Sequence, residues 1–108
     1  MQLIIDEVIS LQSTLQDLAK RLMRNEKNVV NDVMKESNAI SKVYTTFIGD
    51  AGELATMGVE LPVDILMAQL KNYIEACQNC DIMMLTDCVN YEILDTLSIY
   101  REILEQLI

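Results

Sequence analysis

Three cysteines are the residues of this chain with the most distinctive chemistry. Cys77 and Cys80 form a Cys-x-x-Cys pair, and Cys88 follows them in the sequence. Two thiols at this spacing can form a strained disulfide or bind a metal ion together, so a thiol or metal-binding function using Cys77, Cys80 and Cys88 is one hypothesis. A redox pair of this type begins a helix in a βαβ unit, however, and a zinc site needs four ligands in a chain that contains no His. We therefore favour partly buried thiols that pack near a turn, and we predict no cofactor and no bound metal.

Carboxylates on the last predicted helix form a second group. Asp87, Glu92 and Asp95, together with Tyr91, lie one turn apart or less and share part of one face. Such a patch could bind a divalent cation or a basic peptide. Dinuclear carboxylate bundles use Glu-x-x-His pairs, which a chain without His cannot supply, and no sequence feature marks an apolar cleft for acid–base catalysis. We predict that the chain is not an enzyme and that these carboxylates form a solvated face with a preference for basic partners.

Apolar residues recur at alternating gaps of three and four, which is typical of amphipathic helices. This spacing predicts helices at about residues 3–24, 29–57, 62–78 and 82–107, and no segment alternates with period two for long enough to form a strand. Short connections between long helices favour antiparallel neighbours. We predict a single all-α domain over residues 1–108, built as an up-down-up-down four-helix bundle. Three long helices are the alternative if the first two merge.

Glycine and proline mark the boundaries of the second and third predicted helices. Gly58 is expected to take the left-handed position after a helix end, and Pro62 the first position of the next helix. Gly49 and Gly52 interrupt the second predicted helix and allow a kink or restart near Gly49. The interpretation that we favour is that Gly49, Ala51 and Gly52 let a neighbouring helix approach closely.

Paired apolar residues widen the predicted buried stripes beyond a single seam. In an up-down bundle the start of the first helix and the end of the last lie at the same end of the molecule. The apolar residues that gather there are either the closed end of a core or a surface for a partner helix or a second subunit. Seven Met residues favour an adaptable binding surface. The predicted contact residues are Ile5, Ile9, Met57, Ile103 and Ile108.

The net charge of −9 is confined to the second half of the chain. Acidic and basic residues balance over residues 1–49, whereas residues 50–108 hold eleven acidic residues against Lys71 and Arg101. This distribution disfavours binding to nucleic acid or to anionic membranes, and it leaves open a basic partner or an acidic mimic that inhibits a nucleic-acid-binding protein. The odd number of cysteines, the absence of a long apolar run and the lack of signal-peptide features at the start predict a soluble, cytoplasmic protein.

Two resemblances bear on function. The segment Leu-Thr-Asp-Cys-Val-Asn-Tyr-Glu-Ile-Leu at residues 85–94 resembles the last helix of uncharacterised bacterial all-helical domains, which carry an Asp and then Tyr-Glu before an apolar run. In size, charge and helical content the chain is similar to small acidic export chaperones of the flagellar and secretion type, which hold an apolar segment of a client. The sequence thus predicts a protein-interaction module, a homodimer or an adaptor or chaperone for a partner helix.

Overall fold

Helices account for almost all of residues 3–107, the part of the chain that this computed structural model describes. The all-α prediction is confirmed, since no strand occurs among these residues. None of the helices in this range is long and apolar enough to pass through a bilayer. The elements are α1 (Ile5–Met23), α2 (Val29–Met34), α3 (Ser37–Gly49), α4 (Ala51–Thr56), α5 (Val63–Gln78), α6 (Ile82–Asp87), the π-helix η1 (Cys88–Ile93) and α7 (Leu94–Leu107).

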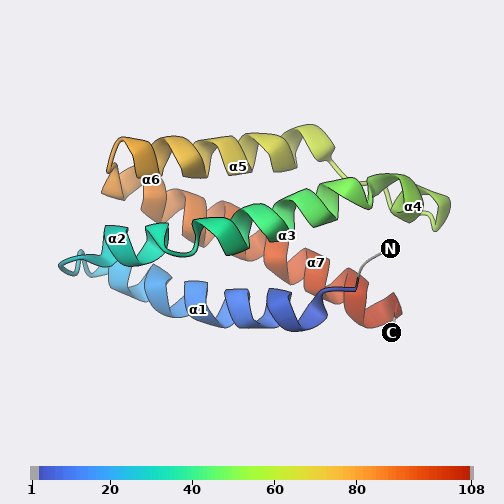
Figure 1. Cartoon of the computed structure of the whole chain (residues 1–108), viewed down its shortest axis with the longest axis horizontal. Helices are drawn as coiled ribbons and strands as arrows, with labels where there is room; N and C mark the ends of the chain where they lie inside the picture. Colours follow the sequence, from blue (N-terminus) through green and yellow to red (C-terminus); the bar gives the residue numbers. More distant parts are fainter. Residues whose placement is uncertain (1–2, 108) are drawn as a thin grey trace.

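The chain follows the long axis of the molecule through four helical stretches, namely α1, then α2 to α4, then α5, then α6 to α7. Each stretch runs in the direction opposite to the one before it (Figure 1). The described residues span 45 × 24 × 19 Å. α1 packs along α7, and α3 packs along α5, which also contacts α6 and η1. As the alternation of direction predicts, the start of α1 and the end of α7 lie at one end, the end to which α4 also extends (Figure 1).

The core follows the predicted apolar stripes. In the last stretch the buried side chains include Leu85, Cys88, Ile93, Leu97 and Leu104. Aromatic rings fill the space between helices, and the rings of Phe47 and Tyr100 stack with their centroids 4.0 Å apart. Such pairs contribute beyond the apolar area that they bury, so this contact joins α3 firmly to α7.

A hydroxyl group from another helix divides the second predicted helix at residues 35–36. The Tyr73 hydroxyl of α5 donates to the Val33 carbonyl over 3.0 Å, and it accepts from the Ser37 hydroxyl over 2.8 Å. The Val33 carbonyl also accepts from the Glu36 amide at 2.9 Å. A regular helix would pair this carbonyl with the amide of Ser37. Side chains that enter the ladder of backbone bonds bend helices, so the contact with Tyr73 accounts for the end of α2 and the restart at α3.

The predicted close approach at Gly49, Ala51 and Gly52 is wrong. Gly49 and Gly52 are exposed, and a Cβ atom built on either would have no atom of the described residues within 4 Å beyond its own local helix. The alternative, a restart near Gly49, agrees with the structure, since α3 ends at Gly49 and α4 begins at Ala51. Exposed glycines weaken a helix without gaining a packing contact, which favours an interruption at this point.

Gly58 ends α4 as predicted, in the left-handed region with a φ of +86°. Its amide donates to the Ala55 carbonyl, and the Val59 amide donates to the Leu54 carbonyl over 2.9 Å. These two bonds define a Schellman motif, in which the residue after the glycine packs back on the helix. Pro62 lies one position before α5, whereas the sequence predicted Pro62 as the first residue of this helix.

The last predicted helix contains a π-helix that the sequence analysis did not predict. Residues Cys88–Ile93 form η1, so α6 and α7 are joined by a wider turn. The buried side chains of this segment are Cys88, Val89 and Ile93. This extra residue rotates α7 relative to a continuous α-helix.

Asp50 lies between α3 and α4 and is buried near the Tyr100 side chain of α7. Asp50 is only 9% exposed, and neither its Oδ2 nor the Tyr100 hydroxyl has a partner at hydrogen-bonding geometry among the described residues. Burial, with the negative charge of Glu53, raises the pKa of Asp50. Burial and the neighbouring Asp50 carboxylate raise the pKa of Tyr100 to about 12.

Substitution of Gly58 and of Gly52 by Ala is expected to have opposite effects. Gly58→Ala forces a left-handed residue to carry a Cβ and is expected to cost about 1 kcal/mol in the free energy of unfolding. Gly52→Ala improves helix propensity at an open position and is expected to leave stability unchanged or raise it. Urea denaturation measures both; equal destabilisation by the two substitutions would contradict this account of Gly58.

Replacement of Asp50 by Asn is expected to change the pH dependence of stability. Because the folded pKa of Asp50 is raised above its ordinary value of 3.8, the unfolded chain releases this proton first as the pH rises. The Asp50 contribution is therefore favourable at low pH and is lost as the pH rises through the folded pKa. Asp50→Asn should be more stable than the parent at neutral pH, and the gain should shrink toward pH ~3. Denaturant titrations across this range test the expectation, with the exposed Asp17→Asn as a control, and a gain that is independent of pH would refute it.

Candidate functional site

A groove between α5 and α7, closed at one end by the connection from α4, is the candidate functional site. Its volume is about 340 Å³. Two of its apolar side chains are more than half exposed, with Ile65 at 58% and Ile99 at 55%. The lining residues are Phe47, Val59, Glu60, Leu61, Pro62, Ile65, Leu66, Gln69, Tyr91, Asp95, Thr96, Ile99 and Ile103.

Three local features position the walls of the groove. The Schellman motif at Gly58 turns the chain so that Val59 and Leu61 pack against the core. α7 then presents residues four apart along one wall, Asp95, Ile99 and Ile103. Side chains at this spacing lie on one face of a helix. The wall on α5 opposite them includes Ile65, so the groove is apolar on both sides.

The floor of the groove is a hydrogen-bonded polar cluster. Gln69 Oε1 accepts from the Tyr44 hydroxyl at 2.7 Å and from the Thr96 hydroxyl at 2.6 Å. Tyr44 and Thr96 are both buried, and burial raises the pKa of the Tyr44 hydroxyl. Within residues 3–107 no hydrogen bond uses Gln69 Nε2, so the amide nitrogen is the group that Gln69 can offer to an occupant.

The structure places the predicted apolar contact residues in different surroundings. Ile103 lines the groove together with Val59 and Leu61, whereas the lining does not include Ile5 or Ile9. Ile5 is partly buried against the core, and Ile9 and Met57 are exposed. Ile108 lies outside the described residues.

The three predicted carboxylates lie in different surroundings. Asp95 lines the groove, and Asp87 lines another pocket. Glu92 is partly buried, and its Oε1 atom is buried with no hydrogen-bond partner in the described part of the chain. The negative charge of Glu92 contributes to the raised pKa of Cys88, which places this carboxylate near the interior. Asp87 and Asp95 thus line separate pockets, and Glu92 is partly buried.

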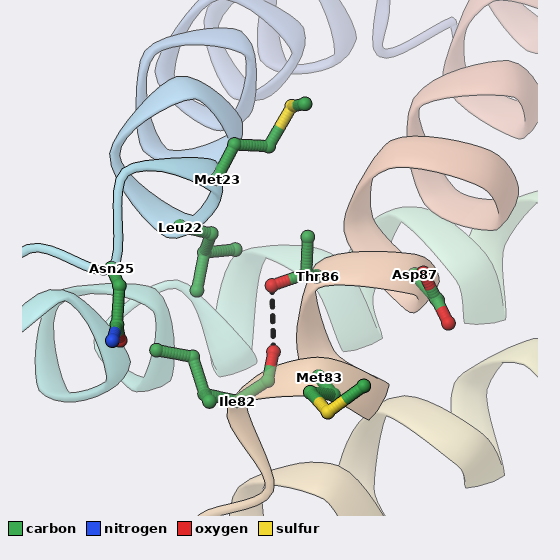
Figure 2. Close-up of a pocket in the computed structure, with 7 residues that line it drawn as sticks. All are labelled: Leu22, Met23, Asn25, Ile82, Met83, Thr86 and Asp87. Carbon is green, nitrogen blue, oxygen red and sulfur yellow. Dashed lines mark hydrogen bonds between the residues drawn. The ribbon is translucent and has the colours of Figure 1, made fainter.

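The pocket that contains Asp87 lies between the end of α1 and α6 (Figure 2). Its volume is about 380 Å³. Met83 is 79% exposed, and the Thr86 hydroxyl donates to the Ile82 carbonyl over 2.6 Å, so it is already used within the helix. Figure 2 shows the Asp87 carboxylate directed away from Leu22. This pocket is lined by seven residues from around the end of α1 and from α6, whereas the groove is lined by thirteen residues that include the hydrogen-bonded pair Gln69 and Thr96.

The sequence analysis missed Ile65 and Ile99, and it assigned Tyr91 to the carboxylate face rather than to an apolar site. All three line the groove and are exposed. The packing of α5 on η1 brings them together, and this contact joins residues far apart in the sequence. Ile65 and Ile99 are off the predicted buried stripes, which was the one available signal.

The cysteines differ in exposure and are free thiols. Cys77 and Cys88 are buried, and Cys80 is exposed in the turn between α5 and α6 with a φ of +49°. Burial raises the pKa of Cys77, and burial with the charges of Glu92 and Asp87 raises the pKa of Cys88 to about 11. Among the described residues no group of three or more Cys, Asp or Glu is arranged to hold a metal ion.

Alkylation should therefore distinguish the three thiols. We expect Cys80 to react with iodoacetamide first in the folded protein at neutral pH, because the other two thiols are buried and their raised pKa values lower the thiolate fraction. Mass spectrometry of peptides after short labelling would measure this order, and labelling in denaturant should remove it. Fast labelling of Cys77 in the folded protein would contradict the expectation and revive the thiol hypothesis.

The groove combines apolar walls, a fixed polar floor and carboxylates at Glu60 and Asp95. Such a lining can bind an apolar group and orient it through a few polar contacts. Comparison of the chain with protein-family models, with curated proteins and with solved structures finds no match.

Proposed function

We propose that the chain is a non-enzymatic protein-interaction module that takes an apolar segment of a protein partner into the groove between α5 and α7. The module is a four-helix bundle of up-down-up-down connectivity, acting in the cytoplasm as an adaptor or chaperone. The observation that carries the proposal is the position of Ile65 and Ile99, two large apolar side chains left more than half exposed on opposite walls of one groove.

The energetic support comes from the area that an occupant would cover. Full burial of an Ile side chain is worth roughly 1.5–3 kcal/mol, so the exposed halves of Ile65 and Ile99 offer about 1 kcal/mol each. Tyr91 adds an exposed aromatic ring at the same groove. Aromatic residues are enriched where protein partners bind most tightly. These contributions suit a reversible complex that also needs contacts outside the groove.

Binding fits the polar groups of the groove better than catalysis does. Gln69 is engaged by two hydroxyl groups, and the charged groups of the lining are the carboxylates of Glu60 and Asp95. A catalytic groove needs a nucleophile or a base oriented by a second group. The hydrogen-bonded floor instead holds α3, α5 and α7 in register and keeps the groove open.

Site-specific photo-crosslinking in the source cell tests this function. A benzophenone amino acid at position 65 or 99 should give covalent adducts with a protein of constant identity, and the same probe at position 83 should not. Met83 is the matched control because it is also an exposed apolar residue that lines a pocket. Adducts at position 83 that equal those at 65 and 99, or no adducts at any position, would refute the proposal.

The protein partner in the groove can also be a second copy of this chain, in which case the chain self-associates. Light scattering over a range of concentrations measures it directly. If the groove holds a second copy, Ile65→Glu with Ile99→Glu should convert dimers to monomers, because buried charges in an apolar interface are costly. The same pair of substitutions should leave the unfolding free energy within about 0.5 kcal/mol of the parent, since both side chains are exposed in the monomer.

A further inference from the structure

We infer that the occupant of the groove is an amphipathic helix of a partner protein whose apolar residues are flanked by Lys or Arg. This inference rests on the proposed function and adds the chemistry of the partner. Two helices lying side by side form a groove that accepts a third helix through residues spaced three and four apart. The walls on α5 and α7 supply this geometry, and the charges around them specify the flanking residues.

Every charged side chain that lines the groove is acidic. Glu60 and Asp95 lie in its lining, and Asp64 lies on an adjoining surface hollow that shares Leu61 and Ile65 with the groove. Lysine and arginine are absent from both linings as far as the structure describes them. A basic residue at the edge of an occupant would therefore meet an attractive potential, and an acidic one a repulsive potential.

The two cations of the second half of the chain are engaged elsewhere. The Lys71 ammonium lies 4.0 Å from a Glu75 carboxylate oxygen on α5. The Arg101 guanidinium pairs with Glu105 at 2.7 Å and donates to the side chain of Gln12 on α1 at 3.1 Å. Neither residue lines the groove, and no ion pair within residues 3–107 involves Glu60 or Asp95.

A second copy of the chain is a poorer occupant. A two-fold interface would place each groove opposite itself, which brings Glu60 and Asp95 against the same carboxylates. Much of the basic charge of the first half is also paired within the monomer. Arg21 and Arg24 pair with Glu26 at 3.2 and 3.0 Å, and Arg21 also pairs with Asp32 at 2.6 Å.

The apolar walls and the carboxylates have separate expected effects on affinity. Contact with Ile65 and Ile99 removes apolar surface from water and strengthens the binding of an apolar segment whatever its charge. Exposed ion pairs are weak and screened by salt, so Glu60 and Asp95 contribute chiefly to the choice of partner and to the association rate.

A pair of synthetic helical peptides tests the inference on the full chain. Both peptides carry Leu on one face, and the other face carries Lys in the first peptide and Glu in the second. Fluorescence anisotropy should show binding of the Lys peptide at about 50 mM salt and weaker binding at about 500 mM. We expect roughly thirtyfold loss of affinity on Ile65→Ser with Ile99→Ser, and about fivefold loss on Glu60→Gln with Asp95→Asn.

Met83→Ser and Asp87→Asn are the matched controls, because they change an apolar and an acidic residue of the other pocket. Neither should alter the affinity for the Lys peptide. Equal affinity for the Lys and Glu peptides, or equal losses in the control variants, would overturn the inference. A dimer in light scattering that Ile65→Ser with Ile99→Ser dissociates would overturn it in favour of a second copy.

The outcomes separate the partner chemistry from the function itself. If photo-crosslinks form at positions 65 and 99 but the Glu peptide binds as well as the Lys peptide, the interaction function stands and the basic partner is wrong. If neither the crosslinks nor the peptide affinities depend on the groove, both proposals fail. Circular dichroism of each variant shows whether the fold is retained, and the charge variants leave the apolar walls intact.

Discussion

The wide turn at η1 determines which side chains of the last helical stretch lie inside the molecule. One additional residue in a turn rotates everything after it by about 100° around the helix axis. With this rotation, Leu97, Tyr100 and Leu104 of α7 are buried, and Thr96 reaches Gln69. The same rotation leaves Ile99 exposed on the wall of the groove. The core contacts of α7 and the candidate binding surface therefore depend on one irregular turn of backbone.

The spacing of apolar residues predicted that the chain is helical and identified most of the core side chains, because this spacing can be read within short segments of the sequence. It predicted the inward side chains of the last helix, whereas the left-handed Gly58 was predicted from the residue type. It did not predict η1, because the buried residues Leu85, Val89, Ile93 and Leu97 keep a regular spacing of four across it. Short irregular turns are seldom visible in composition.

The parts that could not be predicted depend on residues far apart in the chain. The break between α2 and α3 results from a hydroxyl group on Tyr73, which lies two helices later. The groove requires Ile65 and Ile99 to face each other, and this follows from helix packing and the rotation of α7. Ile103 was identified because it belongs to a paired apolar run, and Asp95 because it belongs to a run of carboxylates. Their neighbours Gln69 and Thr96 carry no comparable pattern.

The bond from Tyr73 to the Val33 carbonyl has a consequence for sequence drift. The acceptor is a backbone carbonyl, which any residue at position 33 provides. The hydrogen bond therefore depends on the side chain at position 73. Among the common amino acids only tyrosine places a hydroxyl at that distance from the backbone. Loss of the single oxygen would allow residues 29–49 to join into one straight helix. A single-atom change at a buried site would thus alter the direction of α2 relative to α3, whereas Ser37, the other hydroxyl in the contact, is free to vary more widely.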